Sequence, residues 1–227
     1  MPPKISLITA LVLFDIDGTL VRRAGPHHRQ ALVDAVRKVT GVETTTDGIP
    51  VHGMLDPDIL TSMMRAAGLH AHQITADMPS IIEAAQDIYQ DRVPDIRDKT
   101  CPGVVPLLDV LRDRGVTLAL VTGNLTRIGW RKLHRAGLDH YFRFGSFGEM
   151  APTRAGLAKL AIEEARRRGI TGGISLIGDA TQDVQAAREN NIRAIAVRTG
   201  ITPPEDLEQS APDLLLDDLT HLDPAIF

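Results

Sequence analysis

We predict an α/β fold from this sequence: a doubly wound, mostly parallel sheet with helices on both faces and a helical insertion after its first strand. Two observations lead to this prediction. Short, nearly continuous apolar runs, typical of strands covered on both faces, alternate with helical patterns. Strands joined through helices in this way form right-handed parallel units. The segment 21–99 interrupts the alternation with helical patterns and almost no strand pattern.

Five apolar runs are predicted to be buried strands. They are Leu11–Phe14, Val116–Val121, Ile174–Ile177, Ala194–Val197 and Leu214–Leu216. Each is aliphatic or β-branched and lacks the alternation of polar and apolar residues that a half-exposed strand shows. The apolar stretch Ile5–Phe14 after Lys4 continues into Asp15 without a small-residue cleavage site. We therefore interpret it as a strand and not as a signal peptide.

Helical patterns lie between these strands and are bounded by residues that commonly start or stop helices. Pro102-Gly103 precedes the first pattern, while Gly137 and Gly169 follow the second and third, where glycine readily takes the left-handed conformation. The expected helices are Val104–Arg114, Leu125–Ala136, Ala155–Arg168 and Thr181–Glu189.

Three further helices are predicted inside the segment 21–99. The first spans Pro26–Val39, and the third spans Pro79–Arg92. The second begins at Asp56-Pro57, with Asp56 expected as its N-cap and the proline at the first helical position, and Gly68 ends it. We therefore divide the chain into a core domain, residues 1–20 and 100–227, and a helical domain, residues 21–99.

Composition and charge exclude several function classes. The net charge of −4 and a pI near 6.0, with mixed charges, argue against a nucleic-acid binder with a basic patch. No apolar run reaches the roughly 18 residues of a membrane span. The single cysteine, Cys101, excludes an internal disulfide and is expected to be a buried thiol. We expect a cytoplasmic protein without nucleic-acid or membrane partners. It would be a monomer or a homodimer, between which the sequence does not decide.

Polar residues follow three of the predicted strands. Asp15 and Asp17 follow the first, Thr122-Gly123-Asn124 follows the second, and Asp179 and Asp183 follow a later one. Ligands bind outside the carboxyl ends of parallel strands. Carboxylates gathered there repel one another, and a bound cation removes the repulsion. Because the ligand atoms are all oxygens, with no His or Cys, we expect Mg²⁺.

These strand ends carry motifs that resemble those of the haloacid dehalogenase-like (HAD) hydrolase superfamily. Asp15-Ile16-Asp17-Gly18-Thr19 is similar to its first motif, Thr122-Gly123-Asn124 to its second, and Gly178–Asp183 to its fourth. The resemblance covers the core domain and implies a Rossmann-like fold. The helical domain lies where the family places its C1 cap, and hinges are expected near Leu20–Gly25 and Ile96–Cys101.

The resemblance implies a Mg²⁺-dependent phosphatase that forms an aspartyl-phosphate. Asp15 would attack phosphorus, and Asp17 would protonate the leaving oxygen and then activate water. Asp15, the backbone carbonyl of Asp17 and Asp179 would hold Mg²⁺. Asp183 would be a further ligand or would orient the others.

The same resemblance assigns the binding of the phosphoryl group. Thr122, Gly123 and Asn124 would hold its oxygens. The family usually adds a lysine, often followed by proline, but no Lys-Pro pair occurs at residues 148–156. Arg154, just before a predicted helix, is favoured over Lys159 for this role. The alternatives are that Arg154 is a solvated surface residue or that neither side chain is used.

Other activities on the same scaffold remain open. A phosphomutase of the β-phosphoglucomutase type would keep both carboxylates, and a catalytically silent binding protein would agree with the missing Lys-Pro pair. A 2-haloacid dehalogenase is disfavoured because Asp17 is present. A phosphonatase is disfavoured because Lys38 and Lys99 are poorly placed. We expect a small phosphorylated metabolite as substrate, with phosphoglycolate as the first guess, and the sequence does not reveal the cap residues that select it.

The histidines of the helical domain are expected to be mostly at the surface. His27, His28, His70 and His72 lack the further ligands of a zinc site. His52 and Asp56 flank a loop that either faces the substrate or simply precedes a helix.

Overall fold

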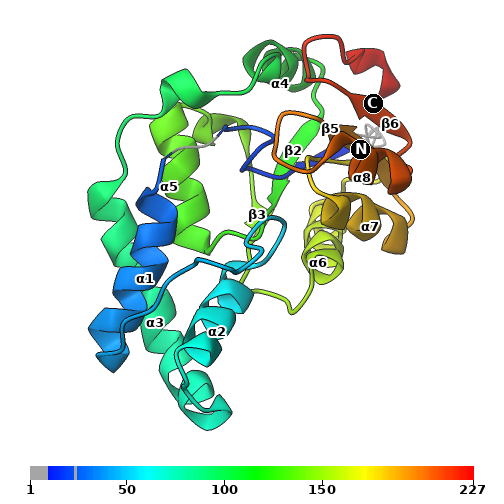
Figure 1. Cartoon of the computed structure of the whole chain (residues 1–227). Coiled ribbons are helices and arrows are strands. Elements are labelled where there is room, and N and C mark those ends of the chain that lie inside the picture. Colours follow the sequence, from blue (N-terminus) through cyan, green and yellow to red (C-terminus); the bar gives the residue numbers. More distant parts are fainter. Residues whose placement is uncertain (1–9, 23–24) are drawn as a thin grey trace, which may run out of the picture.

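The computed structural model describes residues 10–22 and 25–227, and its centre is a six-stranded parallel sheet (Figure 1). The strands lie in the order β3-β2-β1-β4-β5-β6, so the chain begins in the middle and extends the sheet first to one side and then to the other. This order confirms the predicted doubly wound fold. The strands are β1 (Leu11–Phe14), β2 (Thr117–Val121), β3 (Gly145–Ser146), β4 (Ile174–Gly178), β5 (Arg193–Val197) and β6 (Leu214–Leu216).

Five helices follow the strands or connect them. They are α4 (Val104–Asp113), α5 (Thr126–Ala136), α6 (Arg154–Arg167), α7 (Thr181–Glu189) and α8 (Pro204–Gln209). The first four lie within a residue or two of their predicted positions. The short elements β3 and α8 were not predicted, because two to six residues carry too little periodicity to be recognised. The last residues form a 3₁₀ turn, Pro224–Ile226.

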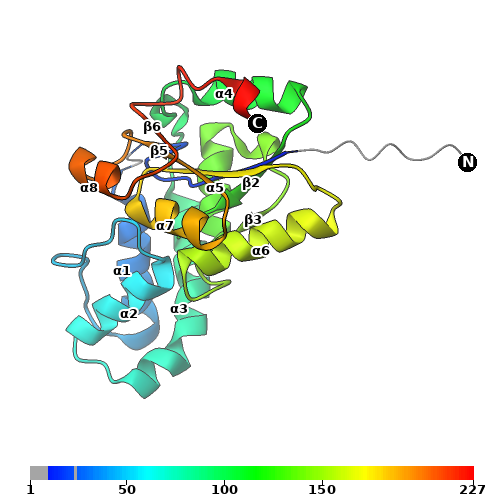
Figure 2. The ribbon, with the colours of Figure 1, turned by 90° about the vertical axis from the view of Figure 1, so that its right-hand side faces the viewer.

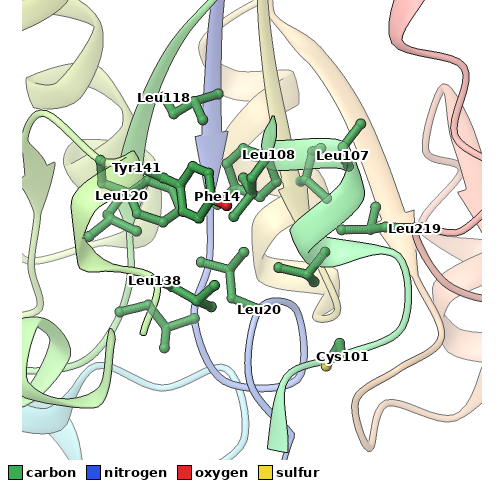
Figure 3. Close-up of a cluster of buried hydrophobic side chains, with 14 of the residues drawn as sticks. Phe14, Leu20, Cys101, Leu107, Leu108, Leu118, Leu120, Leu138, Tyr141 and Leu219 are labelled. Carbon is green, nitrogen blue, oxygen red and sulfur yellow. The ribbon is translucent and has the colours of Figure 1, made fainter. Parts of the chain in front are cut away.

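Alternate residues of β1 contribute to two hydrophobic cores, one on each face of the sheet. Val12 and Phe14 pack on the face that α4 covers, and Leu11 and Leu13 pack on the face that α6 and α7 cover. Figure 3 shows the first core, in which the Phe14 ring lies among side chains from neighbouring strands and α4. Because β1 is buried on both faces, its sequence is continuously apolar, and its end is held firmly where Asp15 follows.

The helical insertion, which we define as residues 25–99, carries α1 (His27–Thr40), α2 (Asp56–Ala66) and α3 (Ala71–Arg92). In Figure 2 these helices form a separate group below the sheet. Their common core also includes Leu125, which precedes α5, and Ile128 of α5. The insertion is therefore packed directly on the helix that follows the Thr122-Gly123-Asn124 motif.

The expected start of the third helix at Pro79 is wrong, since α3 begins eight residues earlier and contains this proline. Proline lacks the N–H of one helical hydrogen bond. The extra turns persist because Ile74 is buried and because Gln73 Oε1 accepts a hydrogen bond of 3.0 Å from the His70 N–H.

Two antiparallel segments join the insertion to the rest of the chain. Val21 pairs with Thr100, the Arg22 N–H donates to the Lys99 carbonyl at 2.7 Å, and the Cys101 N–H donates to the Leu20 carbonyl at 3.0 Å. The predicted hinges fall in these segments. Residues 23–24 of the first hinge lie outside the described residues. The part of the predicted first strand before Ala10 also lies outside them. The division into two domains at 20/21 and 99/100 stays a prediction. Among the residues that the structure describes, no helix is both long and apolar enough to span a bilayer.

Candidate active site

Three buried carboxylates meet where β1 and β4 end. Asp15 follows β1, Asp179 follows β4, and Asp183 lies in the first turn of α7. One oxygen from each carboxylate lies within 4.8 Å of the others, and all three residues are buried. The structure thus brings together three of the four aspartates that the sequence analysis assigned to a metal.

The position of Gly18 allows this close approach. Its φ of +89° belongs to the left-handed region, which glycine adopts at little cost. A Cβ atom at this residue would lie 2.3 Å from Asp179 Oδ2, so a larger residue would collide with the carboxylate.

Burial of these carboxylates works against their ionisation. Burial, together with the charges of Asp15 and Asp183, raises the pKa of Asp179 well above its usual range. Burial raises the pKa of Asp183 to about 7, although the nearby Arg154 opposes this shift. Asp179 Oδ2 and Asp183 Oδ1 are buried and have no hydrogen-bond partner within the described structure. An all-oxygen site with unpartnered buried oxygens fits a hard divalent cation.

Arg154 provides a positive charge inside this cluster. The side chain is buried, and its Nη1 donates to Asp15 Oδ1 at 2.9 Å and to the Val121 carbonyl at 3.3 Å. Its Nε lies 3.4 Å from Asp183 Oδ1, within ion-pair distance. The idea that Arg154 is a solvated surface residue is therefore wrong. Lys159 is exposed on α6, outside the lining of the cavity.

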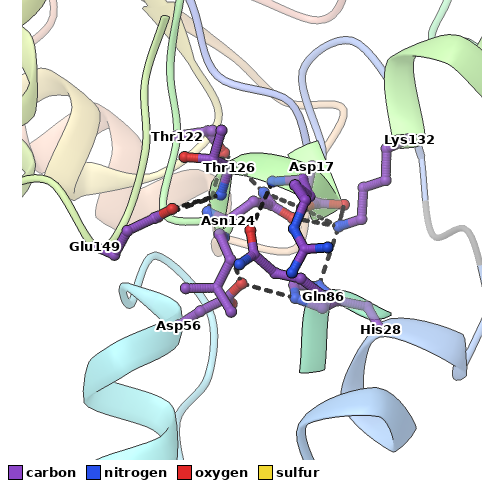
Figure 4. A network of polar contacts seen from close by, with 11 residues as sticks. Asp17, His28, Asp56, Gln86, Thr122, Asn124, Thr126, Lys132 and Glu149 are labelled. Atoms are coloured by element: carbon purple, nitrogen blue, oxygen red, sulfur yellow. Dashed lines mark hydrogen bonds and ion pairs between the residues drawn. The ribbon is translucent and has the colours of Figure 1, made fainter. Parts of the chain in front are cut away.

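A second buried cation, Lys132 of α5, was not predicted from the sequence. Its Nζ donates to both Asp17 oxygens at 2.7 and 2.6 Å and to Asn124 Oδ1 at 2.6 Å, as Figure 4 shows. A fourth contact, 3.1 Å, reaches His28 Nδ1. Burial disfavours the charged form of Asp17, but Lys132, His28 and Asn124 together outweigh this effect, and the pKa of Asp17 is lowered.

One sequence signal pointed to this residue. Lys132 lies four residues after Ile128 and four before Ala136, on the stripe of α5 that is otherwise apolar and buried. A lysine in such a stripe needs a partner inside the protein.

The Thr122-Gly123-Asn124 motif lies between the two cationic groups. Asn124 Nδ2 donates to Asp17 Oδ2 at 2.8 Å and to Thr122 Oγ1 at 2.7 Å. Both ends of the Asn124 amide are thus engaged by the protein, and these hydrogen bonds hold Asp17 and Thr122 in place. Thr122 accepts from Asn124, so its own hydroxyl proton is available to another acceptor.

Asp56 joins the helical insertion to this motif. It is the first residue of α2 rather than its N-cap, because its carboxylate is used elsewhere. Asp56 Oδ2 accepts from the Leu125 N–H at 2.8 Å and from His28 Nε2 at 2.9 Å, and the Asp56 N–H donates to the Gly123 carbonyl at 2.8 Å. Because Lys132 can only donate to His28 Nδ1, the His28 proton is on Nε2. The expectation that His28 lies free at the surface is wrong.

The loop before α2 reaches across to the opposite wall of the site. The Thr202 hydroxyl donates to the Asp179 carbonyl at 2.7 Å, so it accepts from His52 Nε2, 2.5 Å away. The same His52 nitrogen lies 3.8 Å from Asp179 Oδ2. Gly53 approaches Gln182 so closely that a Cβ atom would collide with its amide. This loop, residues 51–56, therefore forms a roof over the carboxylates.

A cavity of about 1070 Å³ lies beneath the roof. The residues that line it include Asp15, Asp17, Thr122, Lys132 and Arg154. It thus combines acidic groups, two cations and a free hydroxyl, a set suited to binding and transferring a phosphoryl group.

Comparison with known proteins agrees with this geometry. A family model described as haloacid dehalogenase-like hydrolase matches residues 9–191. The phosphoglycolate phosphatase of Agrobacterium fabrum is 28% identical over 229 residues, covering 97% of this chain and 93% of the relative.

Solved structures show the same fold. A predicted phosphatase from Clostridium acetobutylicum superimposes with a TM-score of 0.69 at 21% identity, over 96% of this chain and 98% of that one. A β-phosphoglucomutase from Clostridium difficile superimposes with a TM-score of 0.68 at 17% identity, over 96% and 94% of the two chains. By its matched family model and its site geometry, this chain belongs to the haloacid dehalogenase-like hydrolases.

Proposed function

We propose that this hydrolase is a Mg²⁺-dependent phosphatase that acts on a small phosphomonoester through an aspartyl-phosphate. One observation carries the proposal: a buried Asp15, which lines a large cavity, lies beside Asp179, Asp183 and Arg154. A nucleophilic carboxylate surrounded by groups that neutralise negative charge is what phosphoryl transfer requires.

Asp15 would act as the nucleophile and Asp17 as the general acid and base. Asp15 would attack phosphorus, breaking the bond to the ester oxygen, which takes a proton from Asp17 as the alcohol leaves. In the second step Asp17 would remove a proton from water, which attacks the phosphorus and releases phosphate and free Asp15. Asn124 and Lys132 hold the Asp17 carboxylate in place for both steps.

The side chains of Asp15, Asp179 and Asp183, with the backbone carbonyl of Asp17, would hold Mg²⁺. The unpartnered oxygens Asp179 Oδ2 and Asp183 Oδ1 support this assignment. When bound, Mg²⁺ neutralises charge on the phosphoryl oxygens.

Three other groups would bind the phosphoryl group. The Thr122 hydroxyl and the Gly123 N–H lie at the start of the phosphate-binding segment, and Arg154 is the favoured counter-charge. Lys132 supplies a second positive charge close to Asp17. Their combined charge lowers the cost of bringing a phosphate dianion next to Asp15.

The helical insertion would act as a cap that encloses the substrate. Its roof, residues 51–56, contacts Gly123 on one side and Thr202 on the other. Enclosure keeps bulk water from the acyl-phosphate. Because the Agrobacterium relative is named a phosphoglycolate phosphatase, phosphoglycolate is the first substrate to test. The similar fold of a β-phosphoglucomutase keeps a phosphomutase as the alternative.

The proposal is tested by measuring phosphate release from p-nitrophenyl phosphate and from a panel of phosphorylated metabolites. Assays with Mg²⁺ and with EDTA compare the wild type, Asp15→Asn and the control Asp58→Asn, whose side chain is exposed on α2. We expect activity that needs Mg²⁺ and is lost only in Asp15→Asn. Absence of phosphate release from every substrate would contradict the proposal, and transfer between two positions of a sugar phosphate would favour the mutase.

A further inference from the structure

The loop that follows β5, residues 198–202, lies against the carboxylate cluster, although it contains no acidic residue. β5 pairs with β4 in parallel, and Ala196 lies opposite Gly178, the residue before Asp179. The carboxyl ends of the two strands therefore reach the same edge of the sheet. A Cβ atom on Gly200 would collide with Asp179 Oδ2, so the backbone of this loop lies directly beside one of the two carboxylate oxygens that have no partner in the described structure.

Two threonine hydroxyls of this loop hold the turns that carry the carboxylates. Thr199 Oγ1 donates to the carbonyl of Gly18, in the turn after β1. Thr202 Oγ1 donates to the carbonyl of Asp179, in the turn after β4, at 2.7 Å. Asp179 Oδ1 also accepts a hydrogen bond of 3.2 Å from the Thr19 hydroxyl. The bond from Thr202 fixes the main chain of Asp179 and, with it, the direction in which Oδ2 points.

The Thr202 hydroxyl is also in contact with the helical insertion. His52 Nε2, in the roof, lies at hydrogen-bond distance from Thr202 Oγ1. A hydroxyl has a single proton, which here goes to the Asp179 carbonyl, so Thr202 accepts from a His52 that is protonated on Nε2. The bond from His52 therefore keeps the Thr202 proton directed toward Asp179. One small side chain thus joins the roof to a candidate cation ligand.

We propose that Thr202 is a positioning residue of the cation site, formed by Asp15, Asp179 and Asp183, and that His52 of the roof acts on this site through Thr202. The inference rests on the proposed function, in which these carboxylates hold Mg²⁺. Groups that orient metal ligands from outside typically change metal affinity or activity 10- to 100-fold when they are lost. Since the roof contact strengthens Mg²⁺ binding, linkage requires that Mg²⁺ strengthens the roof contact by the same factor. The roof then contacts the core most strongly when the cation is bound.

Binding of Mg²⁺ in the absence of substrate, measured by isothermal titration calorimetry, tests the role of Thr202 independently of turnover. Thr202→Val keeps the shape of the side chain and removes its hydroxyl, so we expect the Kd for Mg²⁺ to rise about 10- to 100-fold. Thr202→Ser keeps the hydroxyl and should restore the affinity. The matched control is Thr75→Val. The Thr75 hydroxyl also donates to a backbone carbonyl, at 3.0 Å, but it is exposed on α3, outside the cavity lining.

A double-mutant cycle tests the path from the roof to the cation site. His52→Leu removes the donor to Thr202, and in the wild-type background we expect it to raise the Kd for Mg²⁺ several-fold. The same change in Thr202→Val should have no further effect, since the hydroxyl that His52 orients is already absent. A direct action of His52 on Asp179 Oδ2, which lies 3.8 Å from its Nε2, would instead give the same effect in both backgrounds.

Each outcome bears either on the inference or on the proposed function. Unchanged Mg²⁺ affinity in Thr202→Val, or an equal effect of His52→Leu with and without the Thr202 hydroxyl, would overturn the inference. Mg²⁺ binding and phosphate release by the wild type would keep the proposed function in that case. Thr202→Ala replaces Thr202→Val, with the same expected result, if the valine variant does not fold. If the wild type neither binds Mg²⁺ nor releases phosphate from any substrate, the proposed function fails and the inference fails with it.

Discussion

Lys132 Nζ lies 2.7 and 2.6 Å from the two carboxylate oxygens of Asp17, so a helix that follows β2 contributes a buried charge to a residue that follows β1. The other donors of this ammonium group reach Asn124 and His28. Lys132 and Asn124 thus hold Asp17, and the helical insertion contacts the same lysine through His28.

Replacement of Lys132 by methionine keeps the length of the side chain and removes its charge. We expect kcat to fall about 10²–10³-fold, the size of effect seen when one preorganised electrostatic group is removed from an active site. Steady-state kinetics with a phosphomonoester that the wild type hydrolyses measure this change in kcat. Lys159→Met, which removes an exposed lysine of α6, should stay near wild type. Equal losses in both variants, or none in Lys132→Met, would contradict the role of Lys132.

Arg154→Lys keeps the charge but removes the planar guanidinium. A lysine cannot contact Asp15, Asp183 and the Val121 carbonyl together. We expect kcat/KM to fall roughly 10²-fold, as for loss of one charge-stabilising group. The matched control is Arg127→Lys, whose ion pairs with Glu83 and Asp87 are exposed. Full activity of Arg154→Lys would show that a point charge is sufficient and that the guanidinium geometry is not used.

Asp56→Ala tests the connection between the insertion and the segment Gly123–Leu125. The change leaves the Leu125 N–H and His28 Nε2 without their acceptor. A buried donor left unsatisfied costs about 1–3 kcal/mol. For a chain of this size, that corresponds to a fall in Tm of roughly 2–12 °C. Differential scanning calorimetry measures it, with the exposed Asp58→Ala as control. An unchanged Tm would mean that these bonds do not hold the insertion in place.

The carboxylate cluster predicts how stability depends on pH. Burial raises the pKa of Asp183 from 3.8 to about 7. A carboxyl group whose pKa is higher in the folded chain than in the unfolded chain favours folding while protonated. That contribution is lost as the pH rises from about 4 to about 7. We expect the Tm of the protein in EDTA to fall across this window.

Mg²⁺ should compensate for the loss, because it binds the ionised carboxylates. The rise in Tm on adding Mg²⁺ should therefore be larger at pH 8 than at pH 5, and Asp183→Asn should reduce this difference. Thermal melts with Mg²⁺ and with EDTA at both pH values provide the measurement. A Mg²⁺ effect of the same size at both values would argue against ion binding at this cluster.

The residues that follow strands were predictable from the sequence, because parallel strands bring their carboxyl ends to one edge of the sheet. Asp15, Asp179 and Asp183 were assigned to one site on this argument, and the structure brings them together. Arg154 was favoured for its place at a helix start, and its guanidinium does reach Asp15. Their catalytic roles stay predictions.

Contacts between distant helices were not predictable in the same way. His28 was expected at the surface because the sequence shows no further ligands of a zinc site, yet its ring joins Asp56 to Lys132. Lys132 lies on α5, and only the tertiary structure brings its Nζ to Asp17, which follows β1. The start of α3 was placed at Pro79 from a local rule, and the burial of Ile74 overrides that rule.

The most direct test of the central claim is to look for the phosphoryl group on Asp15 itself. The enzyme is mixed with Mg²⁺ and a phosphomonoester that it hydrolyses, and the reaction is stopped with acid within the first turnover. The peptides of the enzyme are then mapped by mass spectrometry. The account predicts one phosphoryl group on the peptide that contains Asp15, sensitive to hydroxylamine and absent from Asp15→Asn. Phosphate release by the wild type without this adduct, together with undiminished turnover by Asp15→Asn, would contradict it.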